Sequence, residues 1–256
     1  MSFKIHWMFI KMKYASRMAY RLDFLMSIVA FFLFQFIGPA IIGIIYYAGG
    51  EFPGWTMPQV LLIMGSLALV RGFSFMFYVG ILWATMRHVE RGTLELLFIR
   101  PINKLWMLMM DSFDEEDIGQ LIAGLALTLI ALSLVDVHGS WLLYFVFLFF
   151  GLIFFLSIGL LGSAATVLWV KTRRLYEIID IFMIFASYPK TIYSKEISLL
   201  FTTVLPLFIL GFYPASALLG FAIDNAVLCI VSVTIFFAIS LYLWNAAFKK
   251  YSGAGG

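Results

Sequence analysis

Among the residues that could do chemistry, Arg71 has the most informative position, because it lies inside the apolar run 58–85. A charged side chain at the middle of a membrane span costs at least about 3 kcal/mol, so this arginine must face protein or water. It either lines a translocation path or pairs with an acid across a dimer, or else it snorkels or forms a structural pair. Asp180 is a candidate partner within the chain, although it lies nearer the inner face.

An acidic cluster before the third apolar run could suggest cation binding. The glycine and the alternating ligands of a calcium loop are missing from it, whereas acids at a helix N-terminus interact favourably with the helix dipole. We therefore expect a structural or docking role for Asp111, Asp114, Glu115, Glu116 and Asp117.

Other constellations for catalysis or metal binding are also incomplete. His6, His88 and His138 are far apart, and the Gly-Ser pair ending at Ser66 lacks the second glycine of a nucleophile elbow. The chain has no G-x-x-x-x-G-K-[ST] phosphate-binding loop, so it cannot hydrolyse ATP with that motif. The sequence predicts no catalytic residue and no metal site, and therefore not an enzyme.

The composition places the chain in a membrane. Of its 256 residues, 63% are hydrophobic and 12% are charged, with a mean hydropathy of +1.02. Soluble domains carry about a quarter charged residues, so a water-soluble globule is excluded. The single cysteine, Cys229, allows no internal disulfide, and a net charge of +3 is too small to suggest nucleic-acid binding.

The elements that position these residues are apolar runs long enough to cross a membrane, which needs about 20 residues. Five are clear, at 24–47, 58–85, 118–135, 141–170 and 225–248. Between the last two lies a segment with prolines at 189, 206 and 214, each of which interrupts a helix. We expect one span from about 177 to 187 and then a re-entrant outer segment, 188–224. The alternative is a kinked sixth span followed by an ordinary loop.

The positions of lysine and arginine predict the orientation. They concentrate in the N-terminal arm 1–21, in the loops after the second and fourth spans, and before the tail 251–256, whereas Lys190 and Lys195 lie on the opposite side. By the positive-inside rule both termini are cytoplasmic, which fits six crossings and a single transmembrane domain, 1–250. The basic arm predicts an interfacial helix or a plain topogenic signal, and no cleavable signal peptide is visible. The tail is expected to be flexible.

The inner loop 86–106 contains a second pattern. Gly92 breaks the chain, Thr93 can cap a helix, and Pro101 ends it, with apolar side chains at helical spacing between them. A helix of about seven residues is not stable alone in water, so it should dock on the membrane surface or on a partner.

Two stretches resemble ABC-2-type permeases, the membrane subunits of ATP-binding-cassette exporters. The loop RGTLELLFIRP, followed by LWMLMMDSFDEEDIG, is similar to the family's coupling-helix region. The stretch SYPKTIYSKEISLLFTTVLPLFILGFYPASALLG, 187–220, resembles its outer segment, which here includes Pro189, Pro206, Tyr213 and Pro214. The resemblance covers nearly the whole chain. The expected fold is an all-α polytopic membrane protein: six transmembrane helices, an N-terminal interfacial helix, a cytoplasmic coupling helix and a re-entrant outer segment.

The resemblance implies a permease without its own ATPase. Two cytosolic ATPase subunits, which bind the ATP and magnesium, would pair with this chain and a second permease, identical or homologous. The short inner helix would lie in a groove on the ATPase. Apolar anchors would come from Leu94, Leu97 and Phe98, and polar register from Arg91, Glu95 and Arg100, within the coupling set that also includes Gly92, Thr93 and Pro101.

We therefore expect a subunit of an exporter in a prokaryotic cell membrane that moves a hydrophobic or amphipathic substrate (drug-like, lipid-like or glycolipid). A secondary transporter or channel driven by an ion gradient is the alternative. Such proteins usually carry midplane acids or internal repeats, which are not evident in this sequence.

Overall fold

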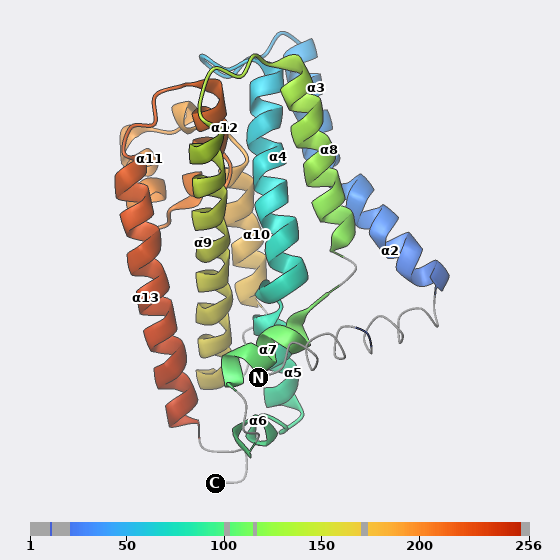
Figure 1. Ribbon diagram of the computed structural model, residues 1–256, viewed down its shortest axis with the longest axis vertical. Helices are drawn as coiled ribbons and strands as arrows, with labels where there is room; N and C mark the ends of the chain where they lie inside the picture. Colours follow the sequence, from blue (N-terminus) through green and yellow to red (C-terminus); the bar gives the residue numbers. More distant parts are fainter. Residues whose placement is uncertain (1–10, 12–20, 100–102, 115–116, 170–173, 252–256) are drawn as a thin grey trace.

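The computed structural model describes residues 11, 21–99, 103–114, 117–169 and 174–251. The described residues are mainly helical, and their only β pairing is an isolated bridge between Phe52 and Trp55. Long helices run roughly side by side, with short helices at both ends (Figure 1). This confirms the expected all-α membrane architecture.

The first apolar segment consists of α2 (Arg21–Phe34) and α3 (Ile37–Tyr47), which together form a candidate span of 27 residues. None of the residues of α2 is buried. At its closest approach α2 meets α8 (Ile118–Leu134) where Gly119 faces the backbone carbonyl of Ile28, and an added Cβ at Gly119 would collide with that carbonyl. Most of α2 therefore presents apolar side chains to its surroundings.

The second segment is one long rod made of α4 (Met57–Ser74), the π-helix η1 (Phe75–Val79) and α5 (Ile81–Glu90). Its 34 residues extend over about 51 Å, whereas a hydrocarbon core is about 30 Å thick. The rod is therefore long enough to cross the membrane and to continue beyond it. The chain then forms two short helices, α6 (Glu95–Ile99) and α7 (Lys104–Ser112), beside the end of α5.

Four further described helices complete the bundle, and two of them are long enough to be spans. α9 (Trp141–Leu168) and α13 (Ala226–Lys250) are both long and apolar enough to cross a membrane, and they pack against each other. The apolar helix α8 has 17 residues, and α10 (Arg174–Ala186) has 13. Four described helices or helix pairs thus meet the length and hydropathy of a span, and the count of six stays a prediction.

Glycines permit a close and extensive contact between α4 and α8. An added Cβ on Gly72 would lie 2.7 Å from the backbone nitrogen of Leu121, and one on Gly124 would lie 2.7 Å from that of Leu69. Contacts this short require glycine, because a Cβ would collide with the facing backbone. Close approach is favourable because membrane helices associate through packing rather than through a hydrophobic effect.

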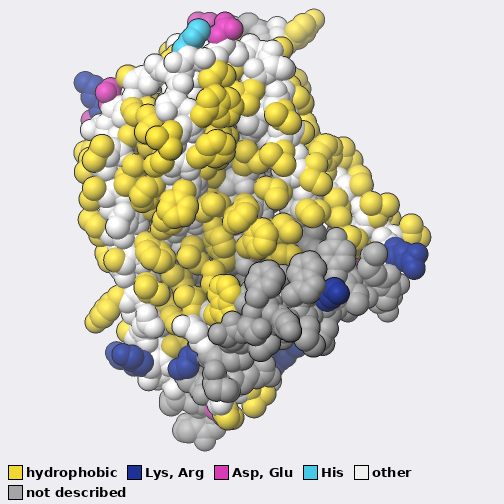
Figure 2. All heavy atoms as spheres, in the orientation of Figure 1, with side chains coloured by type: hydrophobic (Ala, Val, Ile, Leu, Met, Phe, Trp, Pro, Cys, Tyr) yellow, Lys and Arg dark blue, Asp and Glu magenta, His cyan; other side chains and the backbone are white. Residues whose placement is uncertain are grey.

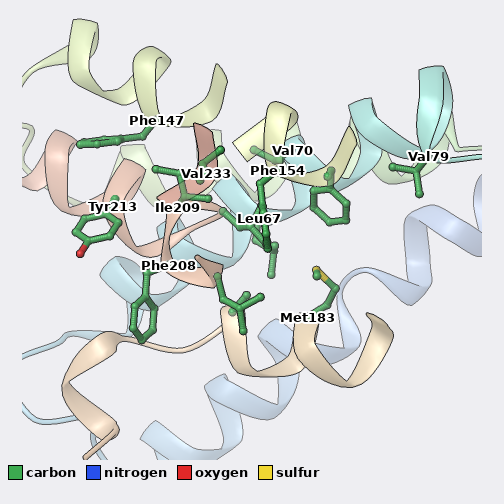
Figure 3. Close-up of a cluster of buried hydrophobic side chains, with 14 of the residues drawn as sticks. Leu67, Val70, Val79, Phe147, Phe154, Met183, Phe208, Ile209, Tyr213 and Val233 are labelled. Carbon is green, nitrogen blue, oxygen red and sulfur yellow. The ribbon is translucent and has the colours of Figure 1, made fainter. Parts of the chain in front are cut away.

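The interior is a continuous apolar core that joins the helices far apart in sequence. Figure 3 shows Leu67 and Val70 of α4 beside Phe154 of α9 and Ile209 of the 3₁₀ turn η3 (Leu207–Ile209). Polar side chains within this core bond across helices: Ser163 of α9 lies 2.7 Å from the Thr85 hydroxyl and accepts a 3.1 Å bond from the Trp244 indole. The core therefore ties α5, α9 and α13 together.

The proline-marked stretch forms a series of short elements at the end of the bundle opposite α6 and α7 (Figure 1). These are the 3₁₀ turn η2 (Lys190–Ile192), α11 (Lys195–Thr203), η3 and α12 (Phe212–Leu219). Every residue of α12 is buried. The structure agrees with short broken helices rather than one kinked helix, since α10 ends at Ala186; their depth in a membrane stays a prediction.

Candidate functional site

Within the loop 86–106, α5 ends abruptly. Gly92 adopts a left-handed φ of 63°, its N–H donates to Val89 O (3.1 Å), and the N–H of Thr93 donates to His88 O (2.9 Å). These two bonds are the Schellman arrangement, which favours glycine at the left-handed position. Gly92 therefore breaks the helix as its sequence position predicts. The Thr93 hydroxyl lies 2.9 Å from His88 Nδ1.

The burial of α6 corrects the expected anchor face. Leu94 and Leu97 are 0% and 1% exposed, so they pack within this chain and are not free to enter a groove on a partner. The outward side chains are Glu95, which is exposed, and Leu96 and Ile99, which are 51% and 77% exposed. The exposed face is therefore not the predicted one. A helix this short is not stable alone, so its apolar leucines pack against its own chain. The Phe98 side chain, Arg100 and Pro101 lie outside the described residues.

The next helix, α7, is bound to the rod. Asn103 caps it, its side-chain oxygen accepting from the N–H groups of Leu105 (3.0 Å) and Trp106 (3.3 Å). At its other end a Cβ on Gly80 would lie 2.6 Å from the carbonyl oxygen of Ser112, and the Asp114 N–H donates to Met76 O at 3.0 Å. The end of α7 is thus in direct contact with the π-helix η1.

Charges hold α7 to α5 as well. The Arg87 guanidinium lies 3.2 Å from the Asp111 carboxylate, and His88 Nε2 lies 3.6 Å from the same oxygen. Part of the acidic cluster therefore has a structural role in this chain. Within the described ranges no group of three His, Cys, Asp or Glu residues is arranged to hold a metal, and residues 115–116 lie outside them.

The π-helix η1 lies within the rod, between α4 and α5, and packs against α7. Tyr78 donates to Leu152 O of α9 at 2.8 Å, and its hydroxyl lies 2.9 Å from that of Ser74. Single-turn π-helices often occur at functional sites. No sequence pattern used above predicted it, since the apolar run 58–85 is equally compatible with a regular helix.

One turn before η1, Arg71 pairs with Asp180 of α10. The two side chains approach to 2.9 Å (Nη2 to Oδ1), with exposed fractions of 28% and 41%. The guanidinium also lies 5.3 Å from the ring centroid of Phe75, and its buried Nε has no hydrogen-bond partner. The acid that pairs with Arg71 therefore belongs to the same chain, and the pair links α4 to α10.

The prolines of the stretch 187–220 each mark the start of a short element. Pro189 precedes η2, Pro206 precedes η3, and Pro214 lies in the first turn of α12. Tyr213 is fully buried and donates to Asp224 O at 2.9 Å. These residues are structural supports of the proline-marked stretch in this conformation.

The molecular surface matches a membrane placement of these sites. On the face drawn in Figure 2 apolar side chains cover the middle of the molecule, and charged side chains gather toward its ends.

Comparison with known proteins also indicates a membrane transport protein. A family model described as "ABC-2 family transporter protein" matches residues 19–255. Neither the curated proteins nor the solved structures gave a match.

Proposed function

The chain belongs to the ABC-2 transporter family, and from that premise we propose that it is the membrane subunit of an ATP-driven exporter. Members are membrane components of transport systems that work with an ATP-binding-cassette ATPase and are not themselves catalytic. We further propose a prokaryotic cell-membrane location with cytoplasmic termini. The assembly has two ATPase subunits carrying ATP and magnesium, and a second permease.

The exposed face of α6 carries the proposal. Glu95, Leu96 and Ile99 point outward from a helix that Leu94 and Leu97 anchor to the chain. Isolated exposed leucines and isoleucines need no explanation. On this family's inner loop, however, the two adjacent apolar side chains beside an acid have the make-up of a small docking surface for the ATPase.

The anchoring suggests how ATP-driven closure would reach the membrane. A force on α6 passes to α7, whose end touches the π-helix through Ser112 and Asp114. The Arg71–Asp180 pair lies one helical turn further along the same rod, so moving η1 would shift α4 relative to α10. A hydrophobic or amphipathic substrate is supported by the largely apolar core between these helices.

Co-expression with the cassette ATPase tests the docking surface. Leu96→Asp and Ile99→Asp should each lower ATPase co-purification and stimulated hydrolysis by at least tenfold, because both bury a carboxylate in an apolar contact. Charge reversal by Glu95→Arg should act in the same direction. All three side chains are exposed, so the variants should fold, and Ile99→Leu serves as the control that keeps the contact.

The unfolding midpoint and yield of each variant separate misfolding from lost docking. If ATPase recovery stayed stoichiometric in both aspartate variants, α6 would not be the docking element. A clean oligomer of this chain with no ATPase and with ion-dependent flux would replace the exporter by a secondary transporter.

A further inference from the structure

A cavity of about 530 Å³ lies between α9, α10 and α13, and neither the α6 surface nor Arg71 lines it. This volume is within the range of small-molecule sites, about 300–1,000 Å³. Its inner wall includes the buried side chains of Phe154, Met183 and Leu207. Figure 3 shows Phe154 and Met183 in the apolar core against which the cavity lies.

The cavity is elongated along the helices. Its lining extends from Phe154 to Leu168 on α9 and from Phe236 to Lys250 on α13. Each stretch corresponds to about 21 Å of helix, compared with about 15 Å for one leaflet of the hydrocarbon core. A chain inserted along it would therefore run from the membrane surface to about the midplane.

The rim of the cavity is open to the surroundings. Leu168, Trp169 and Leu243 line it and are exposed. Tryptophan is enriched at membrane–water interfaces. The opening therefore lies on the lipid-facing flank of the bundle, where the available ligands are lipids and other amphipaths.

Among the described residues that line the cavity, one is charged, and it lies at one end. Lys250 is the last residue of α13, and this end of α13 is on the same side of the molecule as α6 and α7 (Figure 1). The cytoplasmic leaflet is the one that carries anionic lipids, which attract basic groups near its surface. We propose that the cavity binds one acyl chain of an anionic lipid from the cytoplasmic leaflet, with the headgroup against Lys250.

This inference rests on the proposed orientation of the helices, with Lys250 at the cytoplasmic face, and not on ATP coupling. Bulk lipid competes for the apolar wall, so the proposed selectivity comes from the charge of the headgroup beside Lys250. The shape of the wall decides whether a chain enters at all. These two contributions can be separated by different substitutions.

The experiment uses the full chain in nanodiscs that contain trace phosphatidylglycerol or phosphatidylcholine with a photoreactive acyl chain. Crosslinked residues are mapped by mass spectrometry. Ala165→Phe fills the cavity from α9, with Ala246→Phe as a second filling variant from α13; Ala238→Phe adds the same ring to an exposed position of α13 outside the lining. Lys250→Gln removes the charge, and Lys249→Gln is its matched control.

We expect phosphatidylglycerol to label the lining of α9 and α13 at least fivefold more than phosphatidylcholine does. Ala165→Phe should reduce this labelling at least fivefold and Ala238→Phe should not. Lys250→Gln should remove the preference that Lys249→Gln retains. Labelling that no filling variant changes would mean annular lipid only and would overturn the proposal. Equal labelling by both lipids inside a cavity that Ala165→Phe closes would overturn the assignment of an anionic headgroup.

Discussion

Neutralising both Arg71 and Asp180 should cost the protein about as much stability as neutralising either one alone. The side chains are 2.9 Å apart and lie on α4 and α10. Arg71→Gln leaves the carboxylate without its cation, and Asp180→Asn leaves the guanidinium without its anion. The double variant leaves neither charge, so the single losses should not add.

The size of this coupling follows from the exposure of the pair. Unit charges 4 Å apart attract by about 4 kcal/mol at an effective dielectric of 20, whereas fully exposed pairs contribute about 0.2–1 kcal/mol. With exposed fractions of 28% and 41%, the Arg71–Asp180 pair lies between these limits. We expect a coupling of about 2 kcal/mol, or about 30-fold in the unfolding equilibrium.

The stability of the wild type, the two single variants and the double variant is measured by reversible unfolding in mixed micelles. The sodium dodecyl sulfate content is increased and tryptophan fluorescence follows the unfolding. The Arg87–Asp111 pair is a matched control, since its side chains are 3.2 Å apart with exposed fractions of 45% and 34% and join α5 to α7. Its coupling should stay below about 1 kcal/mol. Single losses at Arg71 and Asp180 that add to within about 0.5 kcal/mol would refute the reasoning.

Three further outcomes are expected. Gly124→Ala should destabilise the protein by about 1–3 kcal/mol in the same unfolding assay, because the new Cβ would lie 2.7 Å from a backbone nitrogen of α4. Gly159→Ala should cost far less, because its Cβ would lie 3.6 Å from the nearest atom. Equal losses of stability would contradict the packing argument. Ser163→Ala should cost about 1 kcal/mol, because it removes a bond with Thr85 and one from Trp244, and an unchanged midpoint would show that neither bond contributes. The Glu196 carboxylate accepts hydrogen bonds from the Ser194 hydroxyl and from the backbone N–H of Glu196 itself, and these lower its pKa below the usual 4.5. The stability that its carboxylate adds to α11 should therefore be complete above pH 4.5 and be lost as the pH falls through the lower folded pKa. Comparison of unfolding midpoints with Glu196→Gln at pH 6 and pH 3.5 tests this, and parallel changes in both proteins would contradict it.

Much of the fold could be predicted because hydropathy and chain breakers act locally. The runs 24–47, 58–85, 118–135 and 225–248 agree with the observed helices to within a few residues at most ends. In lipid each backbone N–H and C=O needs a hydrogen-bond partner. A helix provides these partners within one segment, so an apolar run of this length is expected to be a helix. Gly92 ends α5 for an equally local reason, since it adopts a left-handed φ.

The sequence predicted where the site lies along the chain, but not which face of α6 is exposed. Sequence alone located the inner loop, yet it assigned Leu94 and Leu97 to a partner, whereas both are buried in the chain. Apolar residues at helical spacing indicate that one face is covered, and the pattern contains no information about which surface covers it. Ile99 is 77% exposed, and this outward position follows from how α6 packs on α7.

The amino-acid sequence by itself thus determined that this chain is a helical membrane protein, where its helices break, and which family it resembles. These properties depend on composition and on neighbours a few residues away. Tertiary structure alone decided that Arg71 meets Asp180 across 109 positions of the chain, that the rod contains a π-helix, and that α9, α10 and α13 enclose a cavity ending at Lys250. Such features depend on distances between distant segments, and those distances are set only when the helices pack.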